Sequence, residues 1–131
     1  MPGKHVTIGH APRLGLFSHD ELHALHNSIQ GLPVTLVGLP QTDVYMLGRP
    51  NSSSISDSGT LRPRGTLNVP RIVREYGLDV AMSVNNIGNA FTPQGSLDPL
   101  SLCTFGVAVF QAGTKEDCEV LLVCGDLCLA I

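Results

Sequence analysis

The chain alternates short apolar runs, rich in β-branched residues, with segments in which apolar residues recur at helical spacing. The apolar runs at residues 5–10, 34–39 and 78–84 have the length of β-strands. The run at 34–39 shows no alternation of apolar and polar positions, which indicates a strand buried on both faces of a parallel sheet. Because a helical segment follows each run, the pattern predicts an α/β fold of three consecutive strand–helix units with a parallel sheet.

The segments between these runs carry helix start signals. Ser18 is followed three residues later by Glu21, which is the spacing of a capping box, and Gly31 favours the end of that helix. Asn68 is a suitable cap for the next helix, and Pro70 is tolerated in its first turn. The predicted helices cover residues 19–30, 68–76 and 100–111, with a short further segment at 114–124.

We expect a single domain over residues 1–131. Residues 50–65 are rich in Ser, Gly and Pro and predict a mobile loop, of a length that usually has a function. Arginines near this loop either clamp an anion or lie solvated at its ends. They are Arg49, Arg62 and Arg64. Residues 124–131 give no structural prediction.

Composition argues against several partners. The net charge is −3 and the basic residues form no stripe, so we expect no nucleic-acid partner. The longest apolar runs, at 105–110 and 120–124, are too short to span a bilayer, and the amino terminus lacks the apolar core of a secretory signal. We therefore expect a cytoplasmic protein without membrane partners, with secretion lacking a recognisable signal left open.

The four cysteines lie at positions 103, 118, 124 and 128 and form no C-x-x-C pair. They are more typical of buried thiols than of zinc ligands. Disulfides stay open, because an even number of cysteines permits them in an oxidising compartment.

Polar residues follow the predicted strands, where α/β folds place binding and catalytic groups. His10 follows the first strand, Gln41 and Asp43 follow the second, and Asn85 and Asn86 follow the third. The third position therefore holds amides, where a metal or general-base site needs a carboxylate.

Three segments together resemble a known family. They are HVTIGHA at residues 5–11, LPQTDVYMLGR at 39–49, and RGTLNVPRIVREYGLDVAMSVNNIGNAFTPQGSLDPLSL at 64–102. In this order and spacing they resemble the carboxyl-terminal half of cytosine deaminase-like enzymes of the amidohydrolase superfamily, over about residues 5–112. The resemblance implies strands six, seven and eight of a metal-dependent (β/α)8 barrel.

The resemblance also implies roles for particular residues. His10 matches a histidine that lies beside the metal-bound water, and Asn85 stands where the family has an aspartate that binds the metal and handles the proton. The family's other ligands for zinc or iron would lie before residue 1, so no cofactor is expected for this chain. The residues implied to contact a substrate are Gln41, Asp43, Arg49 and Asn86.

The reaction implied by the resemblance is hydrolytic deamination or C–N cleavage of a small nitrogen heterocycle. A metal must lower the pKa of its bound water to make a nucleophile, and Asn85 is a weak neutral ligand. We therefore expect a degenerate or partial amidohydrolase that is inactive alone or contributes to an assembled site. A truncated coding sequence is a further alternative.

A non-catalytic, self-associating interaction protein is the main alternative. Three strand–helix units leave two sheet edges open, and open edges favour pairing with another chain. We therefore expect a homo-oligomer, or a barrel whose missing segments come from elsewhere. A serine-type hydrolase is a lower alternative, because the chain has no G-x-S-x-G elbow.

Three histidines share one face of the first predicted helix. His19, His23 and His26 stand at i, i+4 and i+7. Two of them suit a metal such as zinc, although the glutamate of a protease helix is missing. The alternative is a solvated polar face opposite Leu22 and Leu25.

Overall fold

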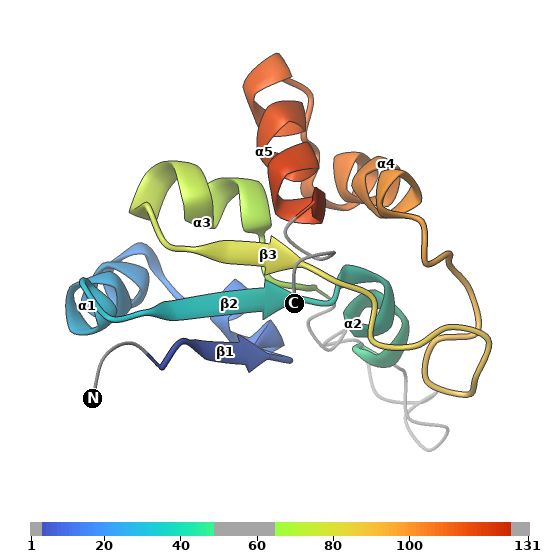
Figure 1. Cartoon of the computed structure of the whole chain (residues 1–131), viewed down its shortest axis with the longest axis horizontal. Coiled ribbons are helices and arrows are strands. Elements are labelled where there is room, and N and C mark those ends of the chain that lie inside the picture. Colours follow the sequence, from blue (N-terminus) through green and yellow to red (C-terminus); the bar gives the residue numbers. More distant parts are fainter. Residues whose placement is uncertain (1–3, 49–64, 127–131) are drawn as a thin grey trace, which may run out of the picture.

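The structure is a computed structural model that describes residues 4–48 and 65–126. Its elements follow one another along the chain as strands and helices, with one short 3-10 helix, η1 (Figure 1). They are β1 (Val6–Gly9), η1 (Pro12–Leu16), α1 (His19–Ile29), β2 (Val34–Gly38), α2 (Pro40–Met46), α3 (Val69–Tyr76), β3 (Val80–Met82), α4 (Pro99–Phe110) and α5 (Lys115–Asp126).

The strands form one parallel sheet in the order β1-β2-β3, so β2 is central. Ile8 pairs with Leu36, and Leu36 pairs with Val80. Helices follow each strand, and the predicted α/β fold with three strand–helix units and a parallel sheet is confirmed. Since parallel strands all end at one edge, the segments after β1, β2 and β3 share one end of the sheet.

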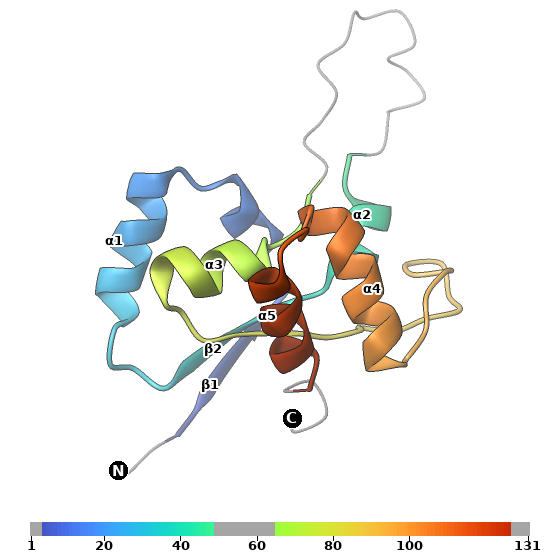
Figure 2. The same cartoon turned by 90° about the horizontal axis from the view of Figure 1, so that it is seen from above.

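The main core lies between one face of the sheet and the helices. Leu36 of β2 and Val80 and Met82 of β3 point to this face, because side chains alternate between the two faces along a strand. They are at most 3% exposed and pack against apolar residues of the helices. In Figure 2, α1 and α3 lie on the same side of the sheet, and α5 stands beside the outer strand β3 in Figure 1. A smaller cluster of Val37, Leu39 and Ala81 forms the opposite face.

The predicted helix caps are present. The Ser18 hydroxyl accepts a hydrogen bond from the Glu21 backbone N–H at 3.3 Å, and the Glu21 carboxylate accepts one from the Ser18 N–H at 2.7 Å. These hydrogen bonds lower the pKa of Glu21, because they favour its charged form. The Asn68 side chain accepts a hydrogen bond from the Arg71 N–H at 3.2 Å and begins α3.

The structure differs from the predictions most clearly in three places. The segment after β2 forms α2, a helix that begins with Pro40 and was not predicted. Its seven residues are too few to display a helical period. The third strand covers only Val80–Met82 of the predicted 78–84. The last helix continues to Asp126, so the first residues of the 124–131 tail are helical. The predicted loop at 50–65 lies outside the described residues except for Gly65.

The two edges of the sheet are in different environments. All four residues of β1 are exposed, and two of them are apolar, Val6 at 49% and Ile8 at 43%. The outer strand β3 is buried, and α5 contacts it. The sequence predicted two open edges, whereas α5 contacts the strand at one of them. Helix α5 also packs against α4, where Leu121 lies next to Gly106.

The cysteines of the described region lie in the last two helices. Cys103 and Cys124 are buried, and Cys118 is half-buried. Burial raises the pKa of the Cys124 thiol to about 11, with a smaller contribution from Cys103. The helices of residues 4–48 and 65–126 include none with the length and apolar content needed to cross a membrane.

Candidate functional site

A row of buried polar residues begins α2, at the carboxyl end of the sheet. Gln41, Thr42 and Asp43 are 4%, 6% and 5% exposed. Buried polar groups require hydrogen-bond partners, because an unpaired one costs roughly 1–3 kcal/mol. Gln41 and Thr42 contact the loop after β3, and Asp43 contacts the segment before α3, so this turn of α2 organises the surrounding loops.

Asp43 is the buried carboxyl of this row. The Thr66 hydroxyl, from the segment before α3, donates a hydrogen bond to Asp43 Oδ2 at 2.7 Å. Burial raises the pKa of Asp43, while the Thr66 hydrogen bond and the charge of His10 lower it to a smaller extent. The structure therefore brings two predicted site residues, His10 and Asp43, within electrostatic range of each other.

Thr42 attaches the loop that follows β3. Its hydroxyl shares a hydrogen bond of 2.6 Å with the hydroxyl of Thr92, which is completely buried. The loop is shaped by Asn89, whose side-chain oxygen accepts hydrogen bonds from the N–H groups of Phe91 and Thr92 at 2.9 and 3.0 Å. This is an Asx-type turn, and it presents Thr92 to α2.

Gln41 lies against the same loop farther along. Its backbone carbonyl accepts a hydrogen bond from Gln94 Nε2 at 3.2 Å. Its side chain lies against Gly95, where an added Cβ would collide with Gln41 Oε1. Gly95 also has a φ of +112°. Only glycine fits both constraints. Gln41 Oε1 is buried and has no hydrogen-bond partner in the described part of the chain.

The remaining predicted site residues follow β1 and β3. His10 is exposed and has a φ of +53°, a left-handed conformation that costs a non-glycine residue roughly 1–2 kcal/mol. Asn86 is half-buried, and its Oδ1 has no partner within the described ranges, whereas Asn85 is exposed. Arg49 lies outside the described residues, as do Arg62 and Arg64.

This arrangement offers hydrogen-bond acceptors more than catalytic groups. Gln41 and Asn86 each present a buried carbonyl oxygen, and Asp43 is a carboxyl whose proton is retained to a higher pH than usual. Within residues 4–48 and 65–126, no group of three or more His, Cys, Asp or Glu side chains is placed to hold a metal ion. Of the polar residues after the strands, Asn85 and Asn86 are neutral amides, which are weaker ligands for zinc or iron than a carboxylate.

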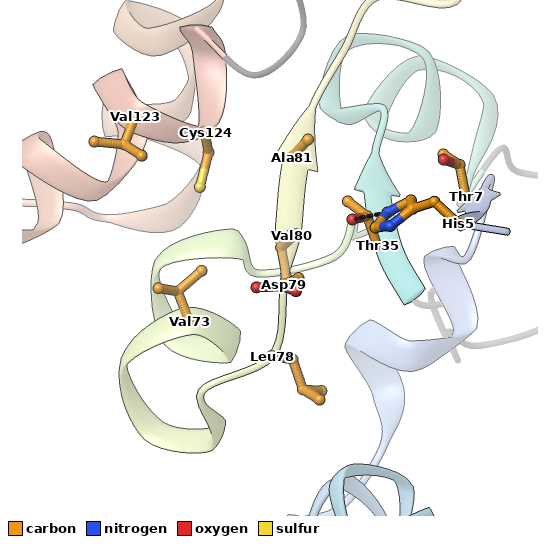
Figure 3. A pocket seen from close by; sticks show the side chains of 10 residues that line it. All are labelled: His5, Thr7, Thr35, Val73, Leu78, Asp79, Val80, Ala81, Val123 and Cys124. Carbon is orange, nitrogen blue, oxygen red and sulfur yellow. Dashed lines mark hydrogen bonds between the residues drawn. The ribbon is translucent and has the colours of Figure 1, made fainter. Parts of the chain in front are cut away.

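A separate cavity of about 530 Å³ lies beside β3, near the beginning of the strands. Figure 3 shows Val73, Val123 and Cys124 on one side of β3, and His5 and Thr35 on the other. His5 Nε2 and Thr35 Oγ1 share a hydrogen bond of 2.7 Å. The beginning of parallel strands is less often a catalytic location than their carboxyl end.

Sequence reasoning did not identify several members of the polar cluster. Thr42 completes it from the row after β2, and Thr66, Thr92 and Gln94 complete it from positions that follow no strand directly. A useful signal was the row QTD directly after a buried strand, since polar residues seldom stay buried without a specific partner.

None of the family models, curated proteins or solved structures compared with this chain matches it. The resemblance to cytosine deaminase-like amidohydrolases therefore stays a prediction.

Asp43→Asn tests the electrostatics of the cluster through pH. The native state holds the Asp43 proton more tightly than the unfolded chain, because burial raises the pKa. Below the pKa of about 3.9 that an unfolded chain has, the Asp43 carboxyl is protonated in both states and does not lower the free energy of unfolding. As pH rises through the raised pKa of the folded state, ionisation of this carboxyl lowers the free energy of unfolding. Asparagine keeps an oxygen for the Thr66 hydroxyl but cannot ionise, so Asp43→Asn should gain stability relative to the parent as pH rises from about 3.9 through the raised pKa, and keep a constant advantage above it.

Urea unfolding at several pH values measures this difference. Asp20→Asn, on the exposed first turn of α1, is the control, and we expect its free energy of unfolding to stay within about 0.5 kcal/mol of the parent. A difference between Asp43→Asn and the parent that is the same at all pH values, or that shrinks as pH rises, contradicts a raised pKa for Asp43.

Proposed function

We propose that this chain is a partial amidohydrolase-like barrel wall that binds a small nitrogen heterocycle at the carboxyl end of its sheet and has no hydrolytic activity alone. The observation that carries the proposal is that Gln41 Oε1 after β2 and Asn86 Oδ1 after β3 are buried without a hydrogen-bond partner among the described residues, and that Asp43 is buried in the same turn of α2 as Gln41. Such acceptors match the N–H groups of a heterocycle, which would satisfy them on binding.

Two further features support this location. The site lies outside the carboxyl ends of parallel strands, where α/β folds bind ligands. His10 holds a strained left-handed conformation beside it, and such strain is concentrated at functional sites. His10, Asp43 and Asn86 are also among the residues that the amidohydrolase resemblance implies.

The proposed loss of catalysis follows from the ligands. Deamination by this superfamily needs a metal-bound water of lowered pKa, and that requires several strong ligands. Asn85, at the position of the family's metal-binding aspartate, is a neutral amide exposed to solvent. A neutral amide cannot accept the proton of an attacking water, so we expect binding without turnover.

Binding of uracil and 1,3-dimethyluracil tests the proposal. Uracil has two ring N–H donors, and the dimethylated ring has none. In ¹H–¹⁵N spectra, uracil should shift the side-chain amide resonances of Gln41 and Asn86, with a dissociation constant of about 1 mM, or roughly −4 kcal/mol. Dimethyluracil should not shift them at equal concentration. Cytosine added to the protein should stay undeaminated.

Variants localise the effect. Gln41→Ala and Asn86→Ala should each weaken uracil binding about fivefold, as expected for one hydrogen bond worth about 1 kcal/mol. Asn27→Ala, which removes an exposed amide from α1, is the matched control and should bind as the parent does. Equal shifts with both ligands, or equal loss in the control, would rule out this site.

Self-association is a second candidate function, favoured by the exposed strand β1. All four of its residues are exposed, including the apolar side chains of Val6 and Ile8. An exposed edge strand with apolar side chains is a template for pairing with a further strand. We propose that a second copy pairs there, β1 against β1, so that the two sheets become continuous.

Ile8→Lys tests this pairing by sedimentation. The parent should sediment as a dimer or larger, and Ile8→Lys should sediment near the single-chain mass of 13.9 kDa, because a charge on the edge opposes pairing. Leu97→Lys, at a 71% exposed loop position, is the control and should keep the parent's mass. A parent that is a strict monomer at high micromolar concentration contradicts edge pairing.

A further inference from the structure

The first turns of α1 hold two imidazoles in contact. His19 and His23 stand one helical turn apart, and their Nε2 atoms are 3.0 Å from each other. The ring centroids are 4.4 Å apart and the ring planes are nearly perpendicular, at 89°. Both side chains are exposed to solvent, so an ion can reach the two nitrogens.

Tyr76 contacts the ring nitrogen of His19 that is turned away from His23. The phenolic oxygen of Tyr76, which is 3% exposed, lies 2.7 Å from His19 Nδ1. The Arg71 guanidinium donates to the same phenolic oxygen at 3.3 Å. In the tautomer that carries its proton on Nδ1, His19 donates to this oxygen, and its lone pair lies on Nε2, the nitrogen that faces His23. A hydrogen bond to the other ring nitrogen is the usual outer-shell support of a metal-binding histidine.

We propose that His19 and His23 form a binding site for a late first-row divalent metal ion, with Tyr76 as the positioning residue. With metal–nitrogen bonds of roughly 2.0–2.1 Å, the 3.0 Å separation of the Nε2 atoms gives an N–metal–N angle of about 90–97°. That angle fits square-planar or octahedral coordination better than tetrahedral coordination. The geometry therefore favours Ni²⁺ and Cu²⁺ over Zn²⁺, in agreement with the general affinity order for nitrogen sites.

Water fills the other positions of this site, since two imidazoles are its only protein ligands among the described residues. When His19 is protonated on Nδ1, His23 donates its Nε2 proton to His19 Nε2, and this proton moves to Nδ1 of His23 when the ion binds, which frees the lone pair for the metal. No net proton is released from neutral imidazoles in this step.

Some charged groups near the site oppose the binding of a cation, and others favour it. Arg71 and the positive end of the α1 dipole oppose it, but Arg71 is paired with Glu75 at 2.9 Å. Asp20 and Glu21, in the first turn of α1, favour it. The balance, with two protein ligands, predicts micromolar affinity for one ion per chain.

Calorimetric titration with Ni²⁺ at pH 7.5 tests the site. We choose Ni²⁺ as the probe because the thiols of the protein do not reduce it. We expect His19→Ala and His23→Ala each to weaken binding at least tenfold, because one imidazole cannot chelate. His5→Ala, which removes an imidazole elsewhere on the surface, is the matched control and should leave affinity unchanged. Tyr76→Phe should weaken binding about threefold or more while one ion still binds, as expected for a positioning residue.

Paramagnetic broadening by Ni²⁺ gives a second readout that does not depend on the stability of a variant. The imidazole resonances of His19 and His23 in the parent protein should broaden first. The proposal fails if other histidines broaden first, if His23→Ala retains the parent's affinity, or if the parent shows no Ni²⁺ binding below about 100 µM.

Discussion

The structure depends on a run of three polar side chains that are buried together at the start of α2. Gln41, Thr42 and Asp43 cannot be solvated there, so each needs a partner within the protein. Thr42 binds the loop after β3 through Thr92, and Asp43 binds the segment before α3 through Thr66. The requirement for hydrogen bonds therefore fixes the loops at the carboxyl end of the sheet. Gln41 Oε1 stays without such a partner in the described residues, and for this reason the same turn is the candidate binding site.

The sheet and this site make a consistent picture of an incomplete wall. The strands are parallel, their ends converge on the polar cluster, and β1 leaves an exposed apolar edge. A parallel sheet normally has both faces and edges covered in larger folds. Our two functional proposals follow from this incompleteness: a ligand completes the hydrogen bonds of the cluster, and a second copy completes the edge. The histidine pair of α1 lies apart from both, held by Tyr76 on the helix side of the molecule.

The sequence predicted the repeating architecture well, because periodicity and caps are local signals. The parallel sheet, the Ser18–Glu21 capping box and the Asn68 cap were all predicted from neighbouring residues. The helix α2 was not, since a seven-residue helix shows too little periodicity. His10 and Asp43 were predicted site residues that lie within electrostatic range, but Thr66 and Thr92 were missed. Their roles depend on contacts between residues 23 and 50 positions apart in the chain, which no local pattern reveals.

The ionisation of Asp43 tests the central claim, which is that a buried polar cluster organises the carboxyl end of the sheet. Carbon-detected NMR can follow the Asp43 carboxyl through a pH titration in the parent and in Thr66→Val. We predict a midpoint above the ordinary value of about 3.9 in the parent, and a higher one in Thr66→Val, which loses a hydrogen bond to the charged form. A midpoint in the parent at or below about 3.9 would contradict the account, because desolvation would then not be the dominant effect on this carboxyl.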